Sequence, residues 1–192
     1  MLTLALGTVQ AFGPHPDPVE CSNCTDPAAC RTATNVSFPR GGGVQIPGLA
    51  FDGCTNLVSV AIPDSIQFIG GSAFRGCTSL ASVHIPDRVS SIEGGAFYGC
   101  TSLAKVSFGS GIYIDRIYAS TFQKCSSLNH LTLPDNLGQI DGYAFDGCSQ
   151  LSSISIPNSV SEVGDSAFAE AGCGPSLYYP GVDLCNCKEC RR

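Results

Sequence analysis

Residues 73–86 read AFRGCTSLASVHIP, and this phrase returns along most of the chain with small changes. Counted by its phenylalanine, the phrase recurs with steps of 23, 23, 25, 23 and 23 residues, at Phe51, Phe74, Phe97, Phe122, Phe145 and Phe168. A nearly fixed period of this size is typical of stacked repeats, in which a unit buries its apolar face only against its neighbours. The sequence therefore predicts a solenoid in which most residues serve as scaffold.

Each repeat contains a segment of the form Leu-x-x-Val-x-Ile, in which every second residue is apolar. Such alternation is typical of a strand with one buried face. The pattern predicts six strands, centred on Val36, Val60, Val83, Val106, Leu131 and Ile154. Pro, often followed by Asp or Asn, lies next to these segments and predicts a turn. The short, glycine-rich return to the next phenylalanine predicts a single helical or 3₁₀ turn around Ala-Phe.

The phrase resembles the BspA-like class of leucine-rich repeat, whose units combine a Leu-x-x-Val-x-Ile-Pro strand with a Gly-x-x-Ala-Phe-x-x-Cys return. The resemblance covers about residues 30–171. It implies an α/β leucine-rich-repeat solenoid that is right-handed, with a parallel β-sheet on its concave side, short helical or 3₁₀ turns on its convex side and Cys-rich caps. Proteins of this class resemble secreted or surface binding scaffolds, in several cases adhesins, and provide no catalytic residues to carry over.

Four segments are expected along the chain. Residues 1–11 form a short apolar start without the basic residues of a secretory signal, so they are either a truncated signal segment or a disordered start. Residues 12–29 are a Pro- and Cys-rich linker with an N-terminal cap. Residues 30–171 form the leucine-rich-repeat solenoid, and residues 172–192 form a Cys-rich C-terminal cap that covers its last repeat.

The twelve cysteines fall into two groups. Six occupy one repeat position: Cys30, Cys54, Cys77, Cys100, Cys125 and Cys148. Stacked neighbours would lie ~4.8 Å apart, close enough for a disulfide, but parallel side chains oppose the required torsion, which favours buried, reduced thiols. The other six flank the solenoid: Cys21, Cys24, Cys173, Cys185, Cys187 and Cys190.

The flanking cysteines are interpreted as disulfides within each cap, since the two ends would lie roughly 25 Å apart. At the N-terminal end, Cys21 could pair with Cys24, or either of them with Cys30. The four C-terminal cysteines allow three pairings, and a zinc site or free thiols remain as alternatives.

The location and the class of partner follow from composition and motifs. Two glycosylation sequons, at Asn23 and Asn35, together with the Cys-rich ends favour a secreted or cell-surface protein. The net charge of −6 and the absence of a basic stripe argue against nucleic acid. No apolar run approaches the ~20 residues that span a bilayer, which argues against membrane insertion.

The sequence contains no recognisable catalytic arrangement. His84 and His130 are interpreted as sharing one repeat position, with Ser107 between them, and would lie about 9–10 Å apart, too far to share a metal ion. No Gly-x-Ser-x-Gly elbow or carboxylate pair accompanies them. The sequence therefore predicts that the protein is not an enzyme and needs no cofactor or metal for chemistry.

One repeat departs from the pattern. Two extra residues enter between Phe97 and Phe122, within residues 108–116, and Gly109 replaces the proline. Ile112 or Ile114 is expected to fill the buried place that Val89 has in its repeat, leaving Tyr113 to point outward. Insertions in repeat arrays often lie on a binding face, the alternative being a tolerated surface loop.

These observations favour a non-catalytic protein-interaction or adhesion-type scaffold that binds a protein, a matrix component or a host surface. The candidate contact residues are Ser82, His84, Lys105, Ser107, Tyr113, His130 and Thr132. The alternatives are a structural extracellular or envelope component without a specific ligand, or a fragment of a larger repeat protein. The oligomeric state is left open.

Overall fold

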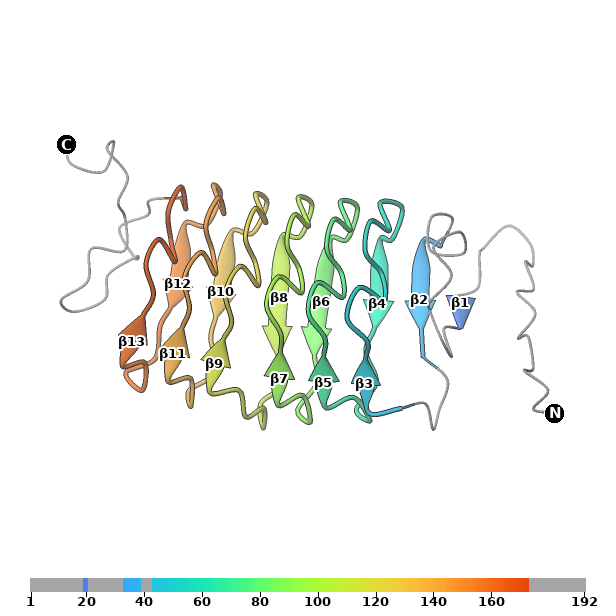
Figure 1. Cartoon of the computed structure of the whole chain (residues 1–192), viewed down its shortest axis with the longest axis horizontal. Helices are drawn as coiled ribbons and strands as arrows, with labels where there is room; N and C mark the ends of the chain where they lie inside the picture. The colour runs from blue at the N-terminus through green and yellow to red at the C-terminus, as the bar shows by residue number, and fades with distance from the viewer. Residues whose placement is uncertain (1–18, 21–32, 39–42, 173–192) are drawn as a thin grey trace.

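A computed structural model of the chain describes residues 19–20, 33–38 and 43–172. The described chain winds as a parallel β-solenoid of about five turns, with successive repeats side by side from β2 to β13 (Figure 1). The predicted N-terminal and C-terminal caps lie mostly outside the described residues, as do the seven cysteines Cys21, Cys24, Cys30, Cys173, Cys185, Cys187 and Cys190.

A seven-stranded parallel sheet forms one face of the solenoid, in the order β1-β2-β4-β6-β8-β10-β12. Its strands are β1 (Val19–Glu20), β2 (Asn35–Ser37), β4 (Ser59–Ala61), β6 (Ser82–Ile85), β8 (Lys105–Phe108), β10 (His130–Thr132) and β12 (Ser153–Ser155). All six predicted strands are confirmed. The additional strand β1 lies in the segment expected to be linker and cap, and it pairs with β2.

The return limbs also form strands, which the sequence analysis did not predict. They make two three-stranded parallel sheets: β3 (Gln45–Ile46), β5 (Phe68–Ile69) and β7 (Ser91–Ile92) in one, and β9 (Arg116–Ile117), β11 (Gln139–Ile140) and β13 (Glu162–Val163) in the other. Two residues per repeat are too few for a periodic pattern in the sequence. Figure 1 shows β9 set apart from β7, and this break coincides with the inserted residues.

The expected helical turns around Ala-Phe are wrong for the described residues, which contain no helix. Backbone N–H groups here bond to the next repeat instead of closing a helix; Phe51 N, for example, donates to Ala73 O at 2.7 Å. Residues with positive φ also flank each turn, as at Ser72 (56°) and Gly76 (69°). A left-handed residue interrupts a right-handed helix, so these segments are stacked turns rather than helical ones.

The core is organised around a stack of phenylalanine rings. Successive rings from Phe51 to Phe168 lie with centroids 5.0 to 5.5 Å apart and planes within 12° of parallel. The stack continues across the irregular repeat, where Phe97 and Phe122 are 5.5 Å apart. The two extra residues are therefore accommodated elsewhere in that turn.

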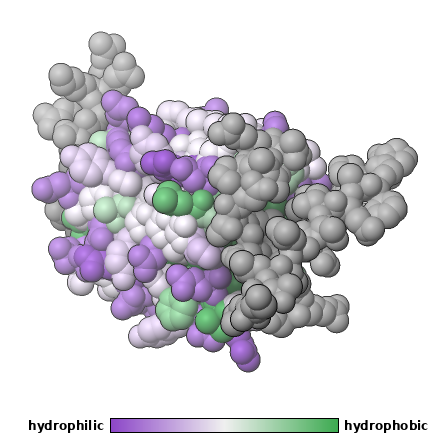
Figure 2. All heavy atoms as spheres, turned by 45° about the vertical axis from the view of Figure 1, so that its right-hand side comes forward, coloured by the Kyte–Doolittle hydropathy of each residue, from purple (hydrophilic) through white to green (hydrophobic). Residues whose placement is uncertain are grey.

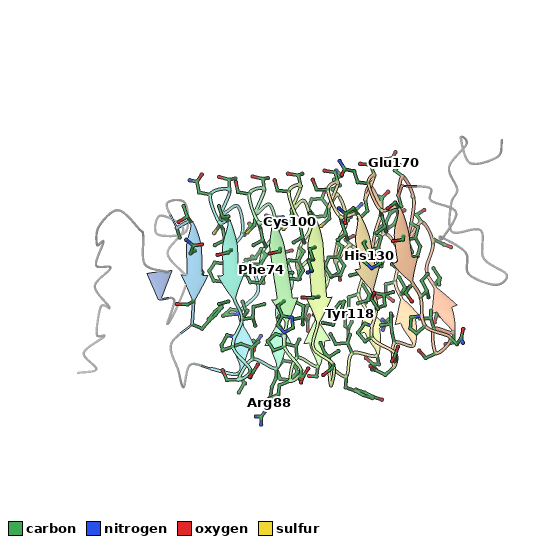
Figure 3. All side chains as sticks on the ribbon, turned by 180° about the vertical axis from the view of Figure 1, so that it is seen from behind. Phe74, Arg88, Cys100, Tyr118, His130 and Glu170 are labelled. Atoms are coloured by element: carbon green, nitrogen blue, oxygen red, sulfur yellow. The ribbon has the colours of Figure 1, made fainter. Side chains whose placement is uncertain are left out.

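The cysteine column lies beside these rings, and Cys77, Cys100, Cys125 and Cys148 are free and buried. Each thiol donates to the carbonyl oxygen of the phenylalanine one repeat earlier, as Cys77 Sγ does to Phe51 O at 3.2 Å. Figure 3 shows Cys100 and Phe74 among the interior side chains. A weak donor of this size fits a buried position beside a carbonyl oxygen.

Cys54 corrects the prediction of a fully reduced column, because it is disulfide-bonded. The four free thiols are not its partners. Its partner therefore lies outside the described residues.

The phenylalanine stack predicts the largest stability effect in the molecule. Replacing Phe97 by Ala removes a fully buried ring with neighbours on both sides, and we expect the free energy of unfolding to fall by about 3–5 kcal/mol. Phe68, which is 40% exposed and outside the stack, is the control. Urea unfolding should show a much smaller loss for Phe68→Ala, and equal losses would contradict the role of the stack.

The buried thiols predict a loss of stability in alkali. Burial raises the pKa of Cys148 to about 12 and that of Cys125 well above its ordinary value. An unfolded thiol ionises near pH 8.5, so between pH ~8.5 and ~12 the unfolded chain binds fewer protons than the folded chain. The free energy of unfolding should therefore fall as pH rises through this window. Urea midpoints at pH 8 and pH 10 measure the fall, and Cys148→Ala should reduce it.

Candidate functional site

The seven candidate contact residues lie on three neighbouring strands and on the inserted loop. Ser82 and His84 are in β6, Lys105 and Ser107 in β8, His130 and Thr132 in β10, and Tyr113 follows β8. The register corrects one expectation: His84 pairs with Ser107, whereas His130 pairs with Lys105. The two histidines therefore lie in different columns, because His130 is four residues before its proline and His84 only two.

A groove of about 860 Å³ opens between β8, β10 and the loops that follow them. Five of the seven candidates line it, and only Ser82 and His84 do not. Its polar lining residues are Lys105, Ser107, Ser110, Tyr113, Asn129, His130, Thr132, Asp135 and Asn136. The strand pairing changes here, since β8 pairs with β6 over four residues but with β10 only at Lys105 and His130.

The inserted residues form one wall of the groove. Ile114 takes the place that Val89 has in the preceding repeat. The Ile114 carbonyl accepts a hydrogen bond from Asn136 Nδ2, and in the next turn the Leu137 carbonyl accepts the equivalent bond from Ser159 Oγ. Ile112 is buried as well, so both isoleucines, rather than one of them, enter the core. Tyr113 between them is 69% exposed and points outward as predicted.

The carboxylate of Asp87, from the preceding repeat, holds this loop. Asp87 Oδ1 accepts the backbone N–H of Gly111 at 3.1 Å. A Cβ atom on Gly109 would overlap the Asp87 carboxylate and lie 2.8 Å from the Asp87 backbone nitrogen. The replacement of proline by Gly109 therefore makes room for the carboxylate that fixes the start of the insertion.

The far end of the insertion is also tied down. Arg116 Nε donates to Asp141 Oδ1 at 2.9 Å, and its guanidinium lies 5.2 Å from the centre of the Tyr118 ring. The hydrogen bond that Arg116 donates to the Asp141 carboxylate raises the pKa of Arg116. With Asp87 at one end and Arg116 at the other, Tyr113 sits on an anchored loop.

Hydroxyl groups on the sheet surface orient the two histidines. His130 Nδ1 lies 2.6 Å from Ser153 Oγ, and His84 Nδ1 lies 3.1 Å from Ser107 Oγ. Each imidazole thus keeps Nε2 for another partner. Lys105 and Asp135 carry the formal charges among the groove's lining residues, so the groove is close to neutral when His130 is uncharged.

Metal-binding clusters, membrane spans and glycosylation sites also bear on the site. Within the described residues, no three His, Cys, Asp or Glu side chains lie together where they could hold a metal ion. No helix in the same part of the chain is long and apolar enough to cross a membrane. Asn35 is half-buried in β2 and bonded to Ser59, while Asn23 lies outside the described residues, so both glycosylation sites stay predictions.

Five polar residues of the site were not predicted from the sequence: Asp87, Ser110, Asn129, Asp135 and Asn136. Asp87 and Asp135 each follow the proline of their repeat, a position that the sequence pattern assigns to a turn. The loss of that proline at Gly109, one repeat after Asp87, is the feature that could have indicated a special role for the aspartate.

Similarity to known proteins agrees with the repeat. A model of the BspA type leucine-rich repeat region matches residues 29–173 in six copies. A leucine-rich repeat protein from Bacteroides ovatus is 30% identical (TM-score 0.60, covering 74% of this chain and 42% of that one). A leucine-rich repeat protein from T. pallidum is 28% identical (TM-score 0.58, covering 75% and 79%).

The chain thus spans about two fifths of the B. ovatus protein. A leucine-rich repeat protein from Eubacterium ventriosum shares the fold at 24% identity, with a TM-score of 0.61 and coverage of 78% of this chain and 45% of that one. No curated protein matches the chain.

The anchoring of the inserted loop is testable without a ligand. Asp87→Ala removes the acceptor for Gly111 N–H, which we expect to weaken the loop by about 1 kcal/mol and speed its amide exchange about fivefold. Asp64, which follows Pro63 as Asp87 follows Pro86, is the matched control. Hydrogen exchange of residues 108–114 should change in the first variant and not in the second. Unchanged exchange in both would show that Asp87 does not hold the loop.

Proposed function

This chain belongs to the BspA-type leucine-rich repeat family, and on that basis we propose that it is a non-catalytic scaffold that binds an extracellular partner through the groove at its irregular repeat. A leucine-rich repeat solenoid is suited to interaction over an extended surface. One observation carries the proposal: five of the seven side chains that look least like scaffold converge on a single groove.

The energetics of the insertion support binding as its role. The return-limb ladder is continuous from β3 to β7 and from β9 to β13 but is broken between β7 and β9. A regular repeat would have kept those backbone hydrogen bonds, so the insertion adds nothing to this ladder. It gives the surface an exposed tyrosine on an anchored loop, a feature that serves recognition better than stability.

A non-catalytic role is supported by the chemistry of the groove. Nucleophilic catalysis by serine needs a histidine base that a third group orients. His130 and Ser153 do form a hydrogen bond, but both are exposed or half-exposed on a sheet surface, and no carboxylate bonds to either of them among the described contacts. Such a pair is suited to contacting a partner.

The proposal also includes an extracellular or cell-surface location. It is supported by the two sequons and by the Cys-rich ends, which fit an oxidising compartment. The described surface carries few exposed large apolar side chains, and the face in Figure 2 has only small green areas among purple and pale ones. A partner would therefore be recognised mainly through polar contacts.

The proposal predicts that two groove side chains support binding. We expect Lys105→Ala with His130→Ala to weaken binding to at least one member of a panel of purified matrix glycoproteins by about tenfold, because two polar contacts are lost. Surface plasmon resonance measures the dissociation constants. Arg88→Ala is the charge control, since Arg88 is exposed at the lower edge in Figure 3, away from His130. Equal weakening by the control, or binding to no member, would contradict the proposal.

A further inference from the structure

We propose that the groove recognises a neutral oligosaccharide. This inference rests on the proposed function and specifies the chemistry of its ligand. Four properties of the groove favour such a ligand: the kind of polar groups that line it, the exposed aromatic ring at its side, its charge, and the pairing of the strands beneath it.

The polar groups match those of a sugar. Asn129, His130, Thr132 and Asn136 bring amide, imidazole and hydroxyl groups to the groove, and Asp135 adds an acceptor. Amides and hydroxyls both donate and accept hydrogen bonds, as sugar hydroxyls do. Some of these side chains keep polar atoms for a ligand. Asn136 bonds the Ile114 carbonyl through Nδ2, which leaves its amide oxygen available. His130 bonds Ser153 Oγ through Nδ1, which leaves its Nε2 available.

The aromatic ring supplies an apolar platform. Tyr113 is 69% exposed, yet its loop is anchored by the bond between Asp87 and Gly111. An exposed aromatic side chain has an apolar face and a polar edge, a combination that can pack against the C–H face of a pyranose while its hydroxyl bonds a neighbouring group. Half-buried Phe108 continues the apolar surface at the end of β8.

The charge favours a neutral ligand over an anionic one. Lys105 is offset by Asp135 within the groove, and His84 lies in β6 outside its lining. A site for sulfated or phosphorylated chains would need several cations directed at the ligand. One lysine and one carboxylate among the lining residues provide no such field.

The strand pairing argues against an extended peptide. Strand addition requires a free sheet edge with unpaired N–H and C=O groups. Both strands beneath the groove are interior, because β8 pairs with β6 and β10, and β10 pairs with β8 and β12. Neither strand therefore offers a free edge to which a peptide could add as a further strand.

The test uses an array of neutral oligosaccharides built from hexoses, deoxyhexoses and N-acetylhexosamines, with sialylated and sulfated oligosaccharides on the same surface. We expect the full chain to bind at least one neutral structure. Tyr113→Ala should reduce that signal about tenfold, the effect of losing one aromatic contact. Tyr143→Ala, which removes another half-exposed tyrosine outside the groove, should leave it unchanged.

Thr132→Val is a second variant that keeps the side-chain shape on β10 and removes its hydroxyl, and a several-fold loss is expected. Melting temperatures check that every variant folds. Binding that prefers the charged oligosaccharides, that ignores Tyr113, or that includes no neutral structure overturns the inference.

Two sources of a neutral glycan are then distinguished with a bound matrix glycoprotein, the same protein after enzymatic deglycosylation, and free dextran and mannan. Loss of binding on deglycosylation points to a glycoprotein, whereas binding to the free polysaccharides alone points to a polysaccharide. Binding that survives deglycosylation while the array stays negative would overturn the sugar inference and leave the scaffold proposal standing. Failure of both assays would overturn both.

Discussion

Stacking in register is the constraint on which the rest of this molecule depends. Each turn must place a phenylalanine about 5 Å from the next one and a backbone N–H opposite the carbonyl of its neighbour. A repeat of 23 residues meets both conditions at once, so the ring stack, the thiol column and the backbone ladders follow from one geometry. A substitution that disturbs this register therefore weakens the packing of the turn against both of its neighbours.

The irregular repeat shows where the constraint can be relaxed. Phe97 and Phe122 remain stacked, and Phe97 N still donates to Thr121 O at 2.9 Å. The two extra residues are accommodated between β8 and β9, where the return-limb ladder is lost. Thr121 replaces the alanine that precedes the phenylalanine in the other five repeats, and its buried hydroxyl donates to the Tyr118 carbonyl at 2.7 Å. The ring stack thus continues through the irregular repeat, while the surface of that repeat differs from the others.

The sequence could predict the features that recur with the 23-residue repeat and the point at which the repeat length changes. The six strands and their outward residues follow from alternation, and Tyr113 follows from counting two extra residues. Features that depend on one neighbouring turn could not be read in this way. The bonds that replace helical turns join different repeats, as from Phe51 to Ala73, and the role of Asp87 depends on a glycine 22 residues later. The four-residue offset of His130 from its proline was visible in the sequence but was overlooked.

The groove lies at the irregular repeat for a physical reason. In a regular array, outward positions repeat with the strand spacing, so they offer a flat surface of mostly small hydroxyl side chains. A hollow with walls needs a turn that differs from its neighbours. The insertion provides this difference by bringing Ile112 and Ile114 into the core and Tyr113 out of it. The anchoring aspartate belongs to the preceding repeat, and His130 and Thr132 belong to the following one, so the groove exists only where three consecutive repeats keep their register. A binding site of this kind therefore inherits its rigidity from the ring stack beneath it, which explains how a solenoid of nearly identical turns can present one distinct surface.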